Sequence, residues 1–264
     1  MEEPRPIALT IAGSDSGGGA GIQADLKTFQ AFGVFGTSVL TAVTAQNTLG
    51  ITAVHPIPLD VVRAQIDAVV TDLPPAALKT GMLATAELVS AVAAAIRAHA
   101  LARYVLDPVM VSTSGHRLLD ADAEATLARE LLPLAAVVTP NLHEARILTG
   151  RDVASLEDMR GAARALVGLG AGAALLKGGH LDGDAVDLLW DGSEERIWRK
   201  PRLSTRHTHG TGCTLSAAVA AGLARGLPLG EATDRAVRWV AKAIETAPGL
   251  GAGHGPVNHF FPTE

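Results

Sequence analysis

One short segment of the chain combines residue types that suit phosphate chemistry: His209, Gly210, Thr211, Gly212 and Cys213 directly precede the apolar helical stretch 215–223. Successive backbone N–H groups at a helix start form a nest that favours anions, and the helix dipole adds to this. A thiol in a first helical turn is expected to have a pKa below its usual value of about 8.5. A lone cysteine is more often inert packing, but this position favours a reactive group beside an anion site.

A second glycine-rich segment, residues 13–21, follows the first strand-like run. Glycine lets the backbone approach a ligand closely and adopt positive φ. The segment is neither a Walker loop, which needs Gly-Lys-Ser/Thr, nor a good match to G-x-G-x-x-G with an acidic partner. Taken alone, it indicates a ligand-binding turn no more strongly than a plain turn capped by Asp15 or Ser16.

Three charged residues come at or just after the ends of predicted strands: Lys177, Asp107 and Glu144. A lysine there can contact a phosphate, and carboxylate oxygens are the ligands that Mg²⁺ takes, often through water. Each also has a plainer interpretation. Lys177 can belong to a β-turn, Asp107 can cap a turn before Pro108, and Glu144 can complete a capping box with Asn141.

These residues need a scaffold, and the pattern of apolar runs predicts one. Strands are predicted over residues 7–12, 34–46, 51–57, 77–82, 104–106, 136–139, 173–177 and 185–190. Helices are predicted over residues 20–32, from 58 through 70, and over 87–99, 121–131, 142–148, 155–169, 211–225 and 231–246. Such alternation is typical of an α/β fold with a central, mostly parallel sheet flanked by helices. No linker-like tract interrupts it, so we expect a single domain over residues 1–264. Ligands of such sheets bind beyond the carboxyl ends of the strands, where the unusual residues lie.

Composition narrows the function classes. The net charge of −5 argues against a nucleic-acid partner, which would require a basic face. One cysteine cannot form an internal disulfide, and this fits a reducing compartment. The N-terminus lacks the pattern of a signal peptide, and the apolar runs are too short to span a bilayer. We therefore expect a cytoplasmic protein with no membrane partner.

The motifs, taken together and in order, resemble those of the hydroxymethylpyrimidine/phosphomethylpyrimidine kinase family, which belongs to the ribokinase-like superfamily. The resemblance runs from about Ile7 to Phe260. The matching segments are residues 12–28, Ala45-Gln46-Asn47-Thr48, Lys79-Thr80-Gly81-Met82-Leu83, Asp107-Pro108-Val109-Met110, Thr139-Pro140-Asn141-Leu142 with Glu144-Ala145, Lys177-Gly178-Gly179-His180, and residues 208–215.

This resemblance implies a three-layer sandwich, a homodimer, and two successive ATP-dependent phosphorylations of 4-amino-5-hydroxymethyl-2-methylpyrimidine in thiamine biosynthesis. It also implies roles for individual residues. By this resemblance, Gln46 binds the pyrimidine, and Gly13, Asp25 and Met82 line its pocket. Asp107 and Glu144 hold Mg²⁺ and face the phosphates, and Lys177 contacts the ATP phosphates. The anion hole is formed by Gly210, Thr211, Gly212 and Cys213.

The residues themselves are compatible with these roles. An aminopyrimidine offers adjacent donor and acceptor groups, and a carboxamide such as Gln46 can pair with both. Related sugar and pyridoxal kinases commonly have Asp where this chain has Cys213, and we expect the thiol to act as general base for the first phosphorylation. No transferable motif occurs over residues 182–200, so the pocket for the nucleotide base is not located.

Three alternatives stay open at this point. A pyridoxal or related vitamin kinase of the same fold would take a similar heteroaromatic ring with a hydroxymethyl group. A non-catalytic ligand-binding regulator would be expected to lack Asp107, Lys177 or the Gly-Thr-Gly segment, and all are present. A Rossmann oxidoreductase is disfavoured because the first glycine loop departs from the dinucleotide-binding fingerprint.

Overall fold

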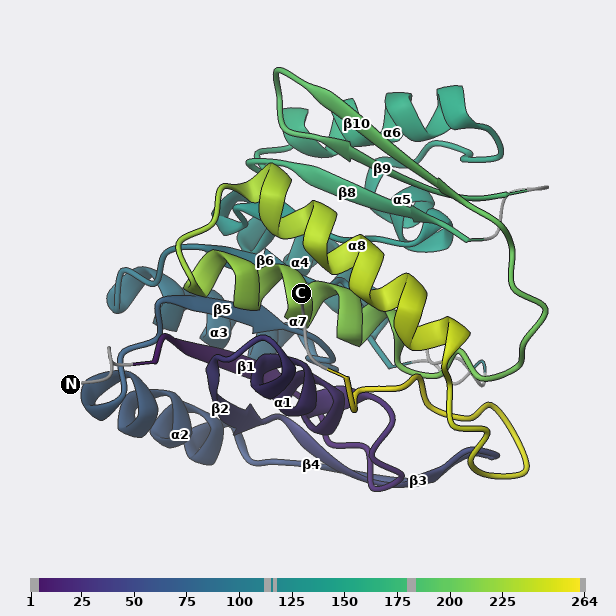
Figure 1. Ribbon diagram of the computed structural model, residues 1–264. Helices are drawn as coiled ribbons and strands as arrows, with labels where there is room; N and C mark the ends of the chain where they lie inside the picture. Colours follow the sequence, from purple (N-terminus) through teal and green to yellow (C-terminus); the bar gives the residue numbers. More distant parts are fainter. Residues whose placement is uncertain (1–4, 112–114, 116–117, 180–183, 262–264) are drawn as a thin grey trace.

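A central eight-stranded sheet organises the computed structural model of the chain, which describes residues 5–111, 115, 118–179 and 184–261. The strand order is β10-β9-β8-β7-β6-β5-β1-β2, and a separate two-stranded sheet pairs β3 with β4 (Figure 1). All pairings from β8 to β2 are parallel, while β9 and β10 are antiparallel to their neighbours. The predicted α/β class with a mostly parallel sheet is confirmed.

The elements have the following bounds. The strands are β1 Ile7–Ala12, β2 Phe35–Leu40, β3 Ala42–Asn47, β4 Gly50–Pro56, β5 Ala77–Thr80, β6 Tyr104–Leu106, β7 Val137–Val138, β8 Ala174–Gly178, β9 Ala185–Trp190 and β10 Glu195–Lys200. The helices are α1 Gly21–Ala31, α2 Leu59–Asp72, α3 Ala86–Ala98, α4 Ala121–Glu130, α5 Leu142–Thr149, α6 Leu156–Gly168, α7 Thr211–Ala224 and α8 Leu229–Glu245, with the short 3₁₀ helix η1 Leu132–Leu134.

Helices cover both faces of the large sheet (Figure 1). Helices α1, α7 and α8 pack on one face, and α2 to α6 lie on the other. Along β1, Leu9 and Ile11 belong to one apolar core, whereas Ala8 belongs to the core on the opposite face. A strand buried on both faces has no polar alternation, which explains why these runs are uniformly apolar.

The predicted strand over residues 34–46 is wrong in one respect, because the chain leaves the sheet within it. Strand β2 pairs with β1 up to Leu40, which lies opposite Ala12 at the end of β1. The backbone N–H of Thr41 then donates to the carbonyl oxygen of Ala12, and the Thr41 hydroxyl donates to the carbonyl oxygen of Met82. Beyond this point β3 pairs only with β4, as a hairpin that projects past the carboxyl ends of the central strands (Figure 1).

The sequence analysis missed strand β10. Its residues, Glu-Arg-Ile-Trp-Arg-Lys, carry four charges in six positions, and the strand forms the outer edge of the sheet. Charged side chains are common on edge strands because they discourage pairing with a further chain. The predicted helices are all present. Among the helices in the described ranges, none combines the length and apolar character that crossing a bilayer requires.

Candidate active site

The start of helix α7 and the first glycine-rich loop pack backbone against backbone. Gly210 caps α7 with φ of 80°, in the left-handed region that favours glycine. A Cβ at Gly210 would collide with the carbonyl oxygen of Gly19. A side chain here would therefore separate the two loops, so Gly210 is required both for its backbone conformation and for the close approach.

Asp15 organises the first glycine loop from within. One carboxylate oxygen accepts the N–H of Gly17 at 2.8 Å, and the other accepts those of Gly19 at 3.1 Å and Ala20 at 2.8 Å. The second oxygen also accepts from Nε2 of His209 at 2.8 Å. Burial alone would raise the pKa of Asp15, but the His209 hydrogen bond and charge and the backbone N–H groups hold it below its usual value. The loop is thus more than a plain turn, since Asp15 joins it to the segment before α7.

Cys213 lies in the first turn of α7, as predicted, but its expected low pKa is not found. Burial raises the pKa of the thiol to about 11. The Lys79 ammonium and the N–H of Gly21 lower it, whereas Asp107 raises it further. Desolvation therefore outweighs the helix start, and the thiol is neutral near pH 7.

The predicted charged residues come together beside the same helix start. Nζ of Lys177 lies 3.1 Å from Oδ1 of Asp107, and a Cβ added to Gly212 would lie 3.1 Å from that ammonium. Ser216 donates to Oδ2 of Asp107 at 3.1 Å. Burial would raise the pKa of Asp107, but Lys177 and Lys79 lower it below its usual value. The Lys177 ammonium at the end of β8 is thereby held against the predicted anion-binding turn. His180, the last residue of the Lys177 motif, lies outside the described residues.

Of the two roles that the sequence allowed for Glu144, the structure shows the capping box, and the metal-binding role stays a prediction. Glu144 completes a capping box with Asn141 at the start of α5, with contacts of 2.8 and 2.9 Å. It is also 4% exposed, and burial raises its pKa to about 7, with Asp107 adding to the rise and Lys177 opposing it. Two interacting buried carboxylates are costly to ionise together. A divalent cation would relieve that cost, so this pair fits Mg²⁺ bound through one or two carboxylates, water and phosphates. Among the described residues, no cluster of three or more His, Cys, Asp or Glu forms a self-sufficient metal site.

We predict that Glu144 makes folding stability depend on pH when no divalent cation is added. Because its pKa is about 7 in the folded protein and 4.5 ordinarily, the folded state holds more protons than the unfolded state between these values. Stability should therefore fall as pH rises from about 5 to 8, by up to about 3 kcal/mol. Urea unfolding of the wild type and Glu144→Gln at both pH values measures this difference.

The glutamine variant keeps the capping oxygen but does not titrate, so its stability should be flatter over the same range. Glu87→Gln is the matched control, because Glu87 is exposed in the first turn of α3. If Glu144→Gln shows the same decline as the wild type, the titrating group lies elsewhere.

Gln46 lies at the end of the β3–β4 hairpin, partly exposed and facing both glycine loops. Ser16 donates its hydroxyl to the Gln46 carbonyl oxygen at 2.7 Å and accepts the Gln46 N–H at 2.7 Å. The Gln46 side chain lies 3.4 Å from Nε2 of His209. Gly13 and Met82 also lie together, since a Cβ on Gly13 would be 3.1 Å from Sδ of Met82.

Asp25 differs from the other predicted pocket residues because it is fully buried. Its Oδ1 accepts from Nζ of Lys79 at 2.7 Å and its Oδ2 from the Thr10 hydroxyl at 2.6 Å, and Asp25 and Lys79 are both 0% exposed. The Lys79 charge in turn acts on Cys213. In this buried position Asp25 compensates the charge of the Lys79 ammonium. Its carboxylate has no exposed surface for a ligand.

Sequence reasoning assigned no role to Lys79, Ser216 or the C-terminal segment. Lys79 follows Ala77 and Leu78 in a strand that is buried throughout, and a lysine in a predicted strand was the available signal. In the C-terminal segment, the Gly255 carbonyl oxygen accepts the N–H of His209 at 3.1 Å, and Nε2 of His259 lies 3.0 Å from the Thr214 hydroxyl. These contacts tie the chain end to the turn that begins α7.

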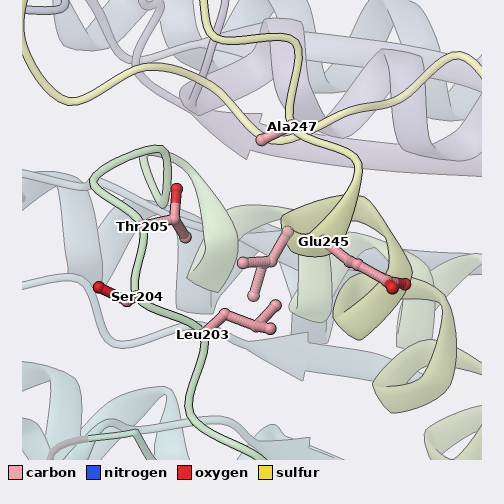
Figure 2. A pocket seen from close by; sticks show the side chains of 6 residues that line it. Leu203, Ser204, Thr205, Glu245 and Ala247 are labelled. Atoms are coloured by element: carbon pink, nitrogen blue, oxygen red, sulfur yellow. The ribbon is translucent and has the colours of Figure 1, made fainter.

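A cavity of about 200 Å³ lies beside the end of α8 (Figure 2). None of the site residues predicted from the sequence lines it. One wall is the segment that leads from β10 to α7, and the other is the end of α8 with the residues after it. The lining residues are Leu203, Ser204, Thr205, Ile244, Glu245 and Ala247.

Several solved structures share this fold. The ADP complex of Bacillus subtilis pyridoxal kinase superposes with a TM-score of 0.90 at 40% identity, covering 97% of this chain and 98% of that chain. The Staphylococcus aureus pyridoxal kinase with AMP-PCP and pyridoxal gives 0.90 at 37% identity, covering 97% and 94%. Phosphomethylpyrimidine kinase from Clostridium difficile 630 gives 0.83 at 41% identity, covering 91% and 100%.

Curated relatives are more similar in sequence. Hydroxymethylpyrimidine/phosphomethylpyrimidine kinase of Rhizobium meliloti is 56% identical over 260 residues, covering 96% of this chain and 97% of that protein. The thiamine biosynthesis bifunctional protein ThiED of Geobacter sulfurreducens is 52% identical over 262 residues, where the match covers 99% of this chain but 54% of that longer protein. The family model described as phosphomethylpyrimidine kinase matches residues 15–258. A match over almost the whole chain, with relatives more than half identical, shows that this protein belongs to the phosphomethylpyrimidine kinase family.

Proposed function

We propose that this protein is an ATP-dependent kinase that phosphorylates 4-amino-5-hydroxymethyl-2-methylpyrimidine and then its monophosphate, for thiamine biosynthesis. The observation that carries the proposal is the position of Lys177, whose ammonium lies against Gly212 at the start of α7 and pairs with Asp107. A cation at an anion-binding helix start suits a transferring phosphoryl group. The names of the relatives about half identical to this chain support the choice of substrate.

Phosphoryl transfer depends more on positioning and charge neutralisation than on covalent chemistry by the protein. In our proposal, the N–H groups of Thr211, Gly212 and Cys213 bind the transferring phosphoryl group, and Lys177 contacts the ATP phosphates. Gln46 holds the pyrimidine ring, with Gly13 and Met82 beside it. The thiolate form of Cys213, a minor species near pH 7 because the thiol pKa is about 11, accepts the proton of the substrate alcohol in the first step.

Asp107 and Glu144 are the residues we propose to hold Mg²⁺, directly or through water. When bound, the metal would neutralise charge on the ATP phosphates. Asp107 is ionised and already paired with Lys177, whereas Glu144 with its pKa of about 7 loses its proton as pH rises through neutrality.

The cavity beside α8 is our candidate for the nucleotide base. Its wall residues Leu203 and Thr205 lie on the segment that continues directly into the anion-binding turn. Apolar carbon from Leu203 and Ile244 suits a ring, and the hydroxyl groups of Ser204 and Thr205 can pair with its edge.

We further propose a single domain, a homodimer and a cytoplasmic location. The eight-stranded sheet contains strands from both ends of the chain, including β1 and β10, and has helices on both faces. This arrangement supports the single domain. The homodimer and the location rest on the family resemblance. Light scattering of the purified protein would measure its mass in solution.

The function is tested by incubating purified protein with ATP, Mg²⁺ and the pyrimidine alcohol and following products by mass spectrometry. The expected result is a monophosphate that appears first and is then converted to the diphosphate. Pyridoxal kinase is the second candidate, because solved pyridoxal kinases superpose with TM-scores of 0.90. A preference for pyridoxal, with no phosphorylated pyrimidine, would replace the first proposal with the second.

A further inference from the structure

The side chain of Gln46 has two polar neighbours, and the other hydrogen bonds of each neighbour determine whether it donates or accepts towards Gln46. The first is Thr44, whose Oγ1 lies 3.3 Å from Oε1 of the Gln46 carboxamide. Thr44 has one hydroxyl proton, and it donates that proton to the Ser14 carbonyl oxygen at 2.9 Å. Towards Gln46, the Thr44 hydroxyl is therefore an acceptor, and it requires the NH₂ end of the carboxamide.

The second neighbour is His209, whose Nε2 lies 3.4 Å from the carboxamide nitrogen of Gln46. The same Nε2 lies 2.8 Å from Oδ2 of Asp15, and an ionised carboxylate only accepts. Nε2 must therefore carry a proton, whether the ring is neutral or charged. Towards Gln46 it is a donor, and it requires the carbonyl end of the carboxamide.

The two requirements agree, although they come from opposite ends of the group. The structure has the oxygen end towards Thr44 and the nitrogen end towards His209, which sets acceptor against acceptor and donor against donor. The two ends of a carboxamide have nearly the same shape, so their hydrogen-bond partners decide which end is oxygen, and here they require the reversed orientation. We propose that His209, held by Asp15, is a positioning residue that orients Gln46 with its carbonyl towards His209 and its NH₂ towards Thr44, and thereby selects an aminopyrimidine.

This orientation has a consequence for the substrate, and here the inference rests on the proposed function. The 4-amino group is a donor and pairs with the carbonyl on the His209 side, while the adjacent ring nitrogen accepts from the NH₂ on the Thr44 side. The 5-hydroxymethyl group is the neighbour of the 4-amino group. It is thereby directed to the side of His209, the residue that precedes Gly210 and the anion-binding turn.

Packing around His209 fits a positioning role. A Cβ on Gly19 would lie 2.6 Å from Cδ2 of His209, so the absence of a side chain at Gly19 makes room for the ring. The backbone N–H of His209 is bound by Gly255 at 3.1 Å. The ring is therefore held by Asp15, while the backbone of His209 is held by the C-terminal segment. Its 8% exposure leaves little freedom to rotate.

The test compares kcat/KM for the pyrimidine alcohol with that for an analogue lacking the 4-amino group. The wild type should prefer the amino compound, because the analogue leaves the Gln46 carbonyl without its donor. In His209→Leu the carboxamide loses its donor neighbour, and this preference should fall by about tenfold with the KM for ATP unchanged. His209→Gln, whose amide N–H can reach the Nε2 position, should restore most of the preference.

Thr44→Val is the second variant if His209→Leu fails to fold, and it should reduce the same preference by removing the acceptor. If the variants lower activity on both compounds equally, His209 only supports the glycine loops and the inference is wrong. If the wild type phosphorylates neither compound, the proposed function fails instead. The two failures are therefore distinguishable.

Discussion

Replacing Lys177 with alanine is expected to lower kcat by about 10²–10³-fold, with little change in the KM for the pyrimidine. Its ammonium lies against Gly212 at the start of α7 and pairs with Asp107. Preorganised charge aimed at a transferring group typically contributes an effect of this size. Steady-state kinetics with ATP and the pyrimidine alcohol varied separately would measure the loss.

Two controls isolate the charge from the fold. Lys177→Arg keeps a cation beside Asp107 and should retain more activity than Lys177→Ala. Arg235→Ala removes an exposed ion pair with Glu231 on α8 and should have no effect on turnover.

Raised Mg²⁺ should partly restore the turnover of Glu144→Ala but not that of Lys177→Ala, since added metal can replace a lost ligand but not a lost cation. Unchanged turnover in both site variants would contradict the assignment of the phosphate end.

Cys213→Ala is expected to slow phosphorylation of the alcohol by about 10²–10³-fold and phosphorylation of the monophosphate far less. An alcohol must lose a proton to attack, and a positioned base contributes an effect of this order. The monophosphate is already ionised near neutral pH and needs no base. Cys213→Asp should keep some alcohol kinase activity but lose the second reaction, because a carboxylate repels the phosphate dianion.

The raised pKa of Cys213 adds a pH signature to this prediction. Because the thiol pKa is about 11, the thiolate fraction rises about tenfold for each pH unit between 7 and 10. If the thiolate is the base, the alcohol step should accelerate with pH relative to the monophosphate step, and Cys213→Ala should abolish this trend. Equal losses in the two steps, without a pH trend, would mean that Cys213 only shapes the anion hole.

Much of the fold followed from local pattern. Apolar runs without alternation identified the buried strands, and the helix signals located α1 to α8 closely. Two features could not be read in this way. Strand β10 is highly charged because it is an edge, and the run from residue 34 to 46 conceals the point where β2 ends and the hairpin begins. Both depend on neighbours that only the folded sheet supplies.

In the candidate site, too, some features were predicted from the sequence and others were not. The motifs indicated that Lys177, Asp107 and Gly212 would meet, and the structure brings them together. The pKa of Cys213 was misjudged because burial and the neighbouring carboxylates outweigh the helix start. Asp25 was expected to line the pyrimidine pocket, whereas in the structure its carboxylate is fully buried and paired with Lys79. Burial and pairing of charges are tertiary properties, so residue spacing does not reveal them.

The similarity to pyridoxal kinases means that the fold alone does not decide between pyridoxal and the pyrimidine as substrate. Structures with TM-scores of 0.90 to this chain act, by their names, on pyridoxal, whereas the curated relatives with 56% and 50% identity from Rhizobium meliloti and Bacillus subtilis are named hydroxymethylpyrimidine/phosphomethylpyrimidine kinase. One fold commonly supports several substrates, so side chains at the site must decide between them. In our proposal Gln46 makes this choice, because its carboxamide can pair with both the donor and the acceptor of an aminopyrimidine edge.

The most direct measurement is therefore the ratio of kcat/KM for the pyrimidine alcohol to that for pyridoxal, in the wild type and in Gln46→Ala. We expect the wild type to favour the pyrimidine. We expect Gln46→Ala to lose about 1–3 kcal/mol of that preference, through a higher KM for the pyrimidine and an unchanged KM for ATP. A wild type that favours pyridoxal, or a Gln46→Ala variant with an unchanged pyrimidine KM, would contradict the account.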